Sequence, residues 1–542
     1  MKKFNQVFQL LIIAVVIVNT TTPIMAQQKS KPNVLFIAVD DLKPVLGCYG
    51  DKLIKTPNID RLAKMGTVFL NNYCQQAVCG PTRASLLTGL RPDVTQVRDL
   101  KTKMRDINPN IVTIPEYFIS QGYQTSGVGK IFHPSCVEKK VDPQSWSIPY
   151  LVAKDSDYFN GNVPIQKHYQ SPELRAAQEK TEVAVVGENG KKKAKKDDGD
   201  DESEARGPAF ECLDLPDNAY DDGVSALLAQ NQMIQLAKNK KPFFMAVGFR
   251  KPHLPFVAPK KYWDLYNRKD LPLAEFQEHA SDTKNFPYQY PGELISYSGL
   301  KEFAKYDKND ENKFGLAIDK QKELIHAYYA AVSYTDAQVG ILLNTLEKLG
   351  TLDNTIIVLW GDHGWHLGDH DMWGKHTNYE QATKAPLIIV GPGIKPGQSK
   401  SMTEFVDVFP TLCELSGGTV PANLDGKSLV PVMKNNKVSV KEYAMSQYPR
   451  KMDKADIKPE DGKGKLMGYS MRTEQYRYTV WLKNFTSDQA YSADKVYTKE
   501  LYDYVKDPLE KVNVSDDKNY ATIAADLDKK LVTYFKSKEV KK

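Results

Sequence analysis

The sequence predicts an α/β fold in which helices sandwich a mainly parallel sheet, followed by a small C-terminal α+β subdomain. Three observations lead to this prediction. Continuous apolar runs such as Val34–Val39 are typical of strands that are buried on both faces of a parallel sheet. These runs alternate with stretches of helical periodicity, such as 219–238 and 321–349. Beyond residue 438, aromatic-rich stretches such as 469–482 favour a small antiparallel sheet.

The composition is that of an ordinary soluble protein. The chain has 542 residues, of which 41% are hydrophobic and 26% are charged, so it can bury a large core and form more than one domain. Its formal net charge of +6 includes two lysines of the leader, Lys2 and Lys3. A charge so near neutrality argues against a nucleic-acid partner. The 6 cysteines are too few and too scattered for a disulfide scaffold, and their pairing stays open.

The N-terminus predicts a secretory signal peptide over residues 1–26. Lys2 and Lys3 precede an apolar stretch around Leu10–Val18, and Ala26 offers a small residue for cleavage. The alternative is a membrane anchor, but the apolar run is short for a bilayer and no stop-transfer pattern follows it. We therefore expect an exported protein, periplasmic or secreted, with no membrane contact after the signal is removed.

The rest of the chain is predicted to form a large domain, residues 27–437, and a C-terminal subdomain, residues 438–542. The subdomain would contain the antiparallel sheet and a final helix near 520–536. Within the large domain, residues 185–207 carry runs of lysines and acids with no apolar period. Such a segment cannot bury enough surface to offset the entropy of ordering it, so we predict a flexible insertion.

Acidic side chains follow two of the predicted strands. The first apolar run ends in Asp40 and Asp41. The strand expected over 355–360 is followed by Asp362 and His363. Ligands collect at the carboxyl ends of strands in an open α/β sheet, and carboxylates suit a hard cation. Either cluster alone would fit an ordinary turn, since aspartate favours turns, but together they predict a metal site.

The most specific motif is Cys79-Gly80-Pro81-Thr82-Arg83, which precedes a leucine-rich run able to form a helix. The N–H groups at the start of such a helix would favour an anionic substrate next to the cysteine. Taken alone, a cysteine before Gly-Pro is more often an inert buried thiol. The interpretation of Cys79 as a catalytic residue therefore depends on further motifs elsewhere in the chain.

Four further candidates lie in short motifs near predicted strands. Lys130 and His133 belong to Gly-Lys-Ile-Phe-His-Pro, and His253 belongs to Lys-Pro-His-Leu-Pro-Phe, at the exit of a buried strand. Lys375 lies in Trp-Gly-Lys, ahead of another strand. Each lysine alone would more often be a surface residue, and each histidine a satisfied structural one.

Together these motifs resemble the type I sulfatases, whose signature is C-x-P-x-R followed by T-G-R. The first five residues match in full, whereas here Leu90 separates Gly89 from the following arginine. The resemblance extends over residues 32–510. The motifs around Lys130 and His253 resemble those of the iduronate-2-sulfatase branch. His363 stands where many sulfatases carry asparagine, and it also resembles this branch.

The resemblance implies an alkaline-phosphatase-like fold with the large domain as the catalytic domain. It also implies that Cys79 is oxidised to Cα-formylglycine (3-oxoalanine) by a formylglycine-generating or anaerobic sulfatase-maturating enzyme. A Ca²⁺ ion would be held by residue 79 and by four further side chains, Asp40, Asp41, Asp362 and His363. Histidine is an unexpected partner for a hard cation, but it agrees with the branch.

The remaining roles are also implied by the resemblance. One hydroxyl of the formylglycine hydrate would attack sulfur, and the sugar alcohol would leave. Arg83 would hold the hydrate, and Lys130 and Lys375 would hold sulfate oxygens. His253 would protonate the leaving alkoxide. His133 would act as the base that removes the remaining hydroxyl proton, which expels sulfate and restores the aldehyde.

The expected reaction is the removal of sulfate from sulfated, uronate-containing oligosaccharides, either of the 2-O-sulfo-iduronate type or from algal ulvan. An oligosaccharide is favoured over a long polymer because the modest charge offers no extended basic track. One alternative is a phosphonate or phosphate monoester hydrolase of the same fold, which the motifs around His253 and His363 argue against. Another is a non-catalytic carbohydrate-binding protein in which Cys79 stays unmodified.

Overall fold

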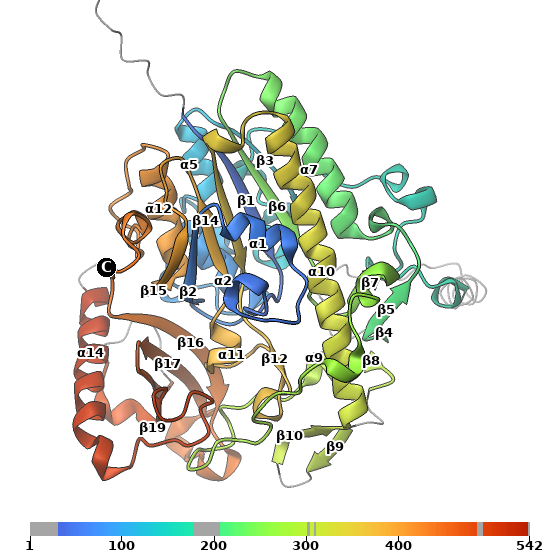
Figure 1. Cartoon of the computed structure of the whole chain (residues 1–542). Helices are drawn as coiled ribbons and strands as arrows, with labels where there is room; N and C mark the ends of the chain where they lie inside the picture. Colours follow the sequence, from blue (N-terminus) through green and yellow to red (C-terminus); the bar gives the residue numbers. More distant parts are fainter. Residues whose placement is uncertain (1–30, 177–205, 301–303, 308–309, 485–490, 540–542) are drawn as a thin grey trace, which may run out of the picture.

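The computed structural model describes residues 31–176, 206–300, 304–307, 310–484 and 491–539 (Figure 1). The predicted signal peptide and residues 185–205 of the predicted insertion lie outside this part of the chain. The last two residues of that insertion, Arg206 and Gly207, belong instead to a short strand, β4 (Arg206–Pro208), which pairs with β8 (Tyr297–Ser298). Backbone pairing therefore orders these two residues, and the flexibility of the rest of the insertion stays a prediction.

A mixed, mostly parallel sheet forms the centre of the described chain, with seven strands in the order β15-β2-β14-β11-β1-β6-β3. β1 pairs in parallel with both of its neighbours, β11 and β6, whereas β14 runs antiparallel to β11 and β2. The predicted α/β class is confirmed. The strands are β1 (Asn33–Val39), β2 (Thr67–Tyr73), β3 (Gln124–Gly129), β6 (Phe243–Phe249), β11 (Thr355–Gly361), β14 (Leu387–Val390) and β15 (Gly397–Glu404).

Helices cover both faces of this sheet, and β1 shows why (Figure 1). Its alternate residues Leu35 and Ile37 pack into the core beneath one group of helices, while Val34 and Phe36 pack beneath the other. A strand buried on both faces must be apolar at every position, which explains the continuous run. The first group is α1 (Pro57–Ala63), α7 (Asp221–Lys238) and α10 (Ile318–Lys348), and the second is α2 (Cys79–Thr88), α5 (Ile114–Ser120) and α12 (Val408–Leu415).

Shorter elements complete the large domain. The helices are α3 (Pro92–Thr95), α4 (Met104–Ile107), α8 (Lys260–Trp263), α9 (Gly292–Ile295), α11 (Glu380–Thr383) and α13 (Val430–Lys434). The strands are β5 (Phe210–Leu213), β7 (Phe256–Pro259), β9 (Ala304–Asp307), β10 (Asp310–Leu316), β12 (His366–Leu367) and β13 (Trp373–Gly374). None of the helices in the described ranges combines the length and the apolar character that a membrane span requires.

An antiparallel sheet and one long helix form the C-terminal α+β subdomain, as the sequence predicted (Figure 1). Leu531 and Phe535 of the helix α14 (Ala521–Glu539) pack against the sheet residues Met471 and Tyr478. The predicted domain limits, 437 and 438, stay a prediction. The described strands of this sheet are β16 (Tyr443–Lys451), β17 (Lys465–Thr473), β18 (Tyr476–Lys483) and β19 (Val496–Asp503).

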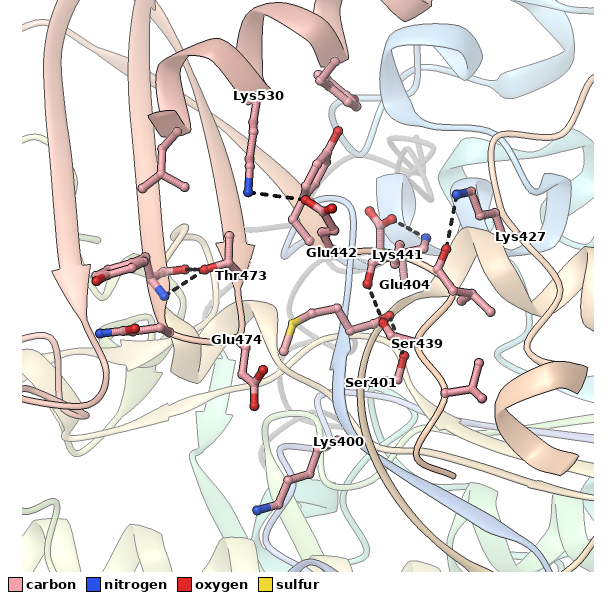
Figure 2. Close-up of a pocket in the computed structure, with 18 of the residues that line it drawn as sticks. Lys400, Ser401, Glu404, Lys427, Ser439, Lys441, Glu442, Thr473, Glu474 and Lys530 are labelled. Carbon is pink, nitrogen blue, oxygen red and sulfur yellow. Dashed lines mark hydrogen bonds and ion pairs between the residues drawn. The ribbon is translucent and has the colours of Figure 1, made fainter. Parts of the chain in front are cut away.

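A groove of about 1640 Å³ lies where the subdomain meets the edge strand β15 (Figure 2). Several of its charged side chains pair with one another: Glu404 lies 2.7 Å from Arg91 and 2.6 Å from Lys441. Lys441 also contacts Asp407 at 2.7 Å. None of the described residues that line the groove belongs to the predicted site. We interpret the pairs as a joint between the two parts of the protein.

The joint gives a testable prediction, because Glu404 is buried. Arg91 and Lys441 outweigh burial and hold the pKa of this carboxyl well below its usual value. Replacing Glu404 with glutamine should cost about 3–5 kcal/mol of unfolding free energy in urea titrations, since it leaves buried cations unpaired. The difference should shrink as the pH falls below about 4, where the unfolded carboxyl takes up its proton.

A matched control for this experiment is Glu347→Gln. Glu347 pairs with Arg61 at 3.1 Å, but the two side chains are 61% and 34% exposed. Water screens such a pair, so its loss should cost less than about 1 kcal/mol. Equal losses in the two variants would contradict the assignment of the Glu404 pairs as a buried joint.

Candidate active site

The two acidic clusters meet at the carboxyl ends of β1 and β11. These strands pair in parallel with Val39 opposite Gly361, so the next residues of each strand lie side by side. The backbone N–H of Asp41 donates to Asp362 Oδ1 at 2.9 Å. Both aspartates and Asp40 are buried. The strand-end reasoning therefore correctly placed these carboxylates together.

Asp41 is held in an uncommon backbone conformation. Its φ of 56° lies in the left-handed region, which a residue with a Cβ adopts at a cost. The hydroxyl of Tyr328 donates to the Asp41 carbonyl at 2.7 Å and accepts from the N–H of Lys43 at 2.9 Å. This clamp from α10 holds the turn that directs the Asp41 carboxylate into the site.

Cys79 is the first residue of α2 and is 2% exposed. Its Sγ lies 3.4 Å from His363 Nε2, 3.8 Å from Asp41 Oδ1 and 3.6 Å from Lys375 Nζ. Burial and the nearby Asp40 raise the pKa of the thiol well above its usual value. A thiol that stays protonated is a poor nucleophile, even at a helix N-terminus. The position thus suits attack, but the unmodified side chain does not.

Arg83 lies one helical turn after Cys79 and is fully buried. It donates from Nη2 to Asp40 Oδ1 at 2.8 Å and from Nε to Asp362 Oδ2 at 3.0 Å. Nη1 donates to the carbonyls of Lys130 and Ile131. Arg83 therefore cross-links both acidic clusters and the segment after β3.

Two lysines give the site its remaining positive charge. Lys130 Nζ lies 2.7 Å from Asp40 Oδ2, and Lys375 Nζ lies 2.9 and 3.0 Å from the two oxygens of Asp41. Burial opposes ionisation of Asp40, but Lys130 and Arg83 outweigh it and hold the pKa of Asp40 well below its usual value. Burial, with Asp40 as a like-charged neighbour, raises the pKa of Asp41 despite Lys375. In this site three buried aspartates thus face three cationic side chains, Arg83, Lys130 and Lys375.

Backbone carbonyls fix the tautomer of two site histidines. Nδ1 of His363 lies 3.0 Å from the carbonyl of Gly364, and Nδ1 of His253 lies 2.6 Å from that of Leu254. A carbonyl only accepts, so each Nδ1 carries the proton and Nε2 is left for the site. Burial lowers the pKa of His363, which leaves a neutral imidazole with a free Nε2 lone pair.

His133 is fixed in the same way by Ser135. The Ser135 hydroxyl donates its one proton to the carbonyl of Leu100, so it must accept from His133 Nδ1, at 2.8 Å. Nε2 of His133 is then the nitrogen able to accept a proton. The role of His133 as a base stays a prediction.

Sequence reasoning missed one side chain of the site, Glu293 on α9. Its Oε1 lies 3.5 Å from His253 Nε2, and its Oε2 lies 3.7 Å from Lys375 Nζ. Glu293 follows no predicted strand and belongs to no recognised motif, so the pattern that revealed the aspartates does not apply to it. An acidic residue after the turn signal Pro291-Gly292 was the one local signal.

The donor set fits a divalent cation. Ligand atoms of Asp41, Cys79, Asp362 and His363 all lie within 4.8 Å of one another, and Asp40 and His253 form an overlapping group with Asp41 and Cys79. Carboxylate oxygens are the ligands that hard cations prefer.

Carboxylates that can bind a cation and amines that can bind an anion thus surround one reactive position. Such a site suits cleavage of an ester that itself carries negative charge, since the amines attract the anion and a cation offsets the charge of the attacking group. The fold and the site therefore define a hydrolase of anionic esters.

Comparisons with known proteins narrow this class. The sulfatase family model matches residues 32–418, and the model for the N-sulphoglucosamine sulphohydrolase C-terminal region matches residues 368–537. Iduronate 2-sulfatase of Homo sapiens is 34% identical, over 90% of this chain and 91% of that relative. The chain therefore belongs to the sulfatase family and is a sulfuric ester hydrolase, which confirms the predicted family and its iduronate-2-sulfatase-like branch.

Solved structures share the fold. A 2-O GAG sulfatase has a TM-score of 0.61 at 23% identity, covering 94% of this chain and 93% of its own. The phosphonate monoester hydrolase of Agrobacterium radiobacter has a TM-score of 0.64 at 22% identity, covering 94% and 96%. These matches confirm the alkaline-phosphatase-like fold. At such identities these structures show the fold, and the assignment as a sulfuric ester hydrolase rests on the family match and the human relative.

Proposed function

We propose that this enzyme removes sulfate from sulfated, uronate-containing oligosaccharides, either of the 2-O-sulfo-iduronate type or derived from ulvan. The human relative is an iduronate 2-sulfatase and one structural neighbour is a 2-O GAG sulfatase, which supports a sulfated glycan as the substrate class. The observation that carries the proposal is the position of Cys79 between His363, Asp41 and Lys375. Cys79 Sγ therefore lies next to two candidate cation ligands and next to one amine that can bind an anion.

Cys79 is the residue that a formylglycine-generating or anaerobic sulfatase-maturating enzyme would convert to Cα-formylglycine. Its place as the first residue of α2, at the head of the Cys-Gly-Pro-Thr-Arg motif, supports this step. When present, the aldehyde hydrate supplies an oxygen nucleophile at the start of α2. The conversion is expected before or during export, since the thiol is buried in the folded chain.

Calcium is the cation that we propose, held by residue 79 and by four side chains, Asp40, Asp41, Asp362 and His363. Ca²⁺ tolerates irregular shells of oxygen ligands better than Mg²⁺ does, and the three aspartates supply such ligands. When bound, the ion supplies Lewis-acid and charge stabilisation. The proton of His363 on Nδ1 leaves its Nε2 available as a ligand.

The cationic side chains would bind the ester. Lys130 and Lys375 would hold sulfate oxygens, and Arg83, which bridges Asp40 and Asp362, would hold the hydrate of residue 79. His253 would deliver a proton to the sugar oxygen as it leaves. His133, whose Nδ1 proton is directed to Ser135, would take at Nε2 the proton whose loss releases sulfate.

We also propose that the enzyme is exported and meets its substrate in the periplasm or outside the cell. The leader of lysines and apolar residues at 1–26 supports this location. A short oligosaccharide is the preferred form of the substrate, because the modest net charge does not favour a long polyanion.

Two measurements test the proposal. Mass spectrometry of the peptide around Cys79, from protein made in its native host, should find the aldehyde or its hydrate. Turnover of an aryl sulfate should exceed that of the matching aryl phosphate, and Cys79→Ala should abolish both. An intact thiol would favour a carbohydrate-binding role, and a preference for phosphate would favour the phosphomonoesterase alternative. A desulfation screen on uronate oligosaccharides would then identify the sugar.

A further inference from the structure

Glu293 has no role in the chemistry described so far, although its carboxylate faces the site. The side chains of Glu293 and His253 are 12% and 14% exposed, whereas those of Asp40, Asp41 and Asp362 are at most 1% exposed. Glu293 therefore lies at the mouth of the site and the aspartates at its base. The base suits the cation and the sulfate, and the mouth is where the sugar must enter.

The fold holds Glu293 in this place. The next two residues on α9, Leu294 and Ile295, are buried in the large core, so the short helix is anchored by its apolar side. Glu293 is thereby directed toward Lys375, which follows β13, and toward His253, which follows β6. Three separate segments converge at this point.

A carboxylate in an anion-binding site has a cost, because it repels any negative group nearby. It also has one clear capacity, since an ionised carboxylate accepts strong hydrogen bonds from hydroxyl groups. In the proposed reaction His253 faces the oxygen that joins sulfur to the sugar. Glu293 Oε1 lies 3.5 Å from the Nε2 of His253, so it would lie beside the sugar ring next to that oxygen.

We propose that Glu293 determines specificity by accepting a hydrogen bond from a free hydroxyl on the carbon next to the sulfated one. A second sulfate at that carbon would remove the donor and place an anion against the carboxylate. Discrimination by an unpaired or like charge is a general route to specificity. This inference rests on the proposed function, because it requires a sugar sulfate as the substrate.

The test uses three substrates: a methyl uronoside 2-O-sulfate, its 3-deoxy analogue and its 2,3-di-O-sulfate. The wild-type enzyme should prefer the first over each of the others by at least about tenfold in kcat/KM, which is the worth of one charged hydrogen bond. Glu293→Gln keeps the size of the side chain and removes the charge. It should raise kcat/KM for the disulfate, relative to kcat/KM for the monosulfate, by about tenfold.

Glu293→Ala should make the enzyme indifferent to the neighbouring hydroxyl, so that the deoxy and hydroxy monosulfates react alike. Glu347→Gln, an exposed carboxylate on α10, is the matched control and should change no ratio. The comparison of the deoxy and hydroxy substrates on the wild-type enzyme needs no variant, so it can refute the inference even if a variant fails to fold.

Two results would overturn the inference alone. In one, an active wild-type enzyme treats the hydroxy and deoxy monosulfates equally. In the other, Glu293→Gln slows all three substrates by the same factor, which would indicate an effect on His253 or on the fold. Failure of the wild-type enzyme on every sugar sulfate, with activity on aryl phosphate, would instead remove the proposed function and this inference with it.

Discussion

Replacing Asp41 with asparagine should lower kcat/KM for an aryl sulfate by at least about 10³-fold. Asp41 contacts Lys375 through both of its oxygens and lies 3.8 Å from Cys79. In the proposed reaction it would therefore act on the nucleophile, the anion-binding amine and the cation. Asparagine keeps the shape but removes the negative charge. The measurement is steady-state turnover combined with the calcium content of the purified protein.

The calcium content separates the two functions of the carboxylate. The wild-type enzyme, stripped by a chelator, should regain activity when Ca²⁺ is added, whereas the Asp41→Asn enzyme should require a much higher concentration. Asp264→Asn is the control, because Asp264 is 58% exposed and pairs with Lys260 away from the site. Full activity of the Asp41 variant without bound metal would refute the proposed ligand set.

The strands that the sequence predicted are those buried on both faces. β1, β6 and β11 are continuous apolar runs. A strand buried on both faces needs apolar residues at successive positions, so the sequence pattern reveals it. β15, with the sequence GQSKSMTE, is an edge strand of the sheet and is polar, so it does not differ from a loop in its pattern. The antiparallel direction of β14 is also absent from its residues, because direction depends on which strand it pairs with.

The same distinction applies to the site. Asp40 and Asp362 follow two strands that are neighbours in the sheet, so the rule for strand ends was sufficient to bring them together. Glu293 reaches the site from a four-residue helix between irregular segments, and its position depends on the packing of Leu294 and Ile295. Long-range packing of this kind leaves no local pattern.

Replacing His253 with asparagine should lower kcat for a sugar sulfate by about 10²–10⁴-fold, the usual worth of a general acid. It should lower kcat for p-nitrophenyl sulfate by less than about tenfold, because nitrophenolate leaves without needing a proton. His253 Nε2 points into the site beside Asp41, at 3.8 Å, while Nδ1 is held by the Leu254 carbonyl. The measurement is kcat for the two substrates with wild-type and variant enzyme.

The electrostatics of His253 make this comparison informative. Burial, with Lys375 and Lys130, lowers the pKa of His253 to about 3, so the imidazole is neutral in the free enzyme at pH 7. A bound sulfate ester would offset the charge of both lysines and so favour the protonated acid. His133→Asn is the contrasting variant: it should slow both substrates alike, because the alcohol has already left when sulfate is released. Equal losses for sugar and aryl sulfates in the His253 variant would mean that His253 positions the ester and does not donate the proton.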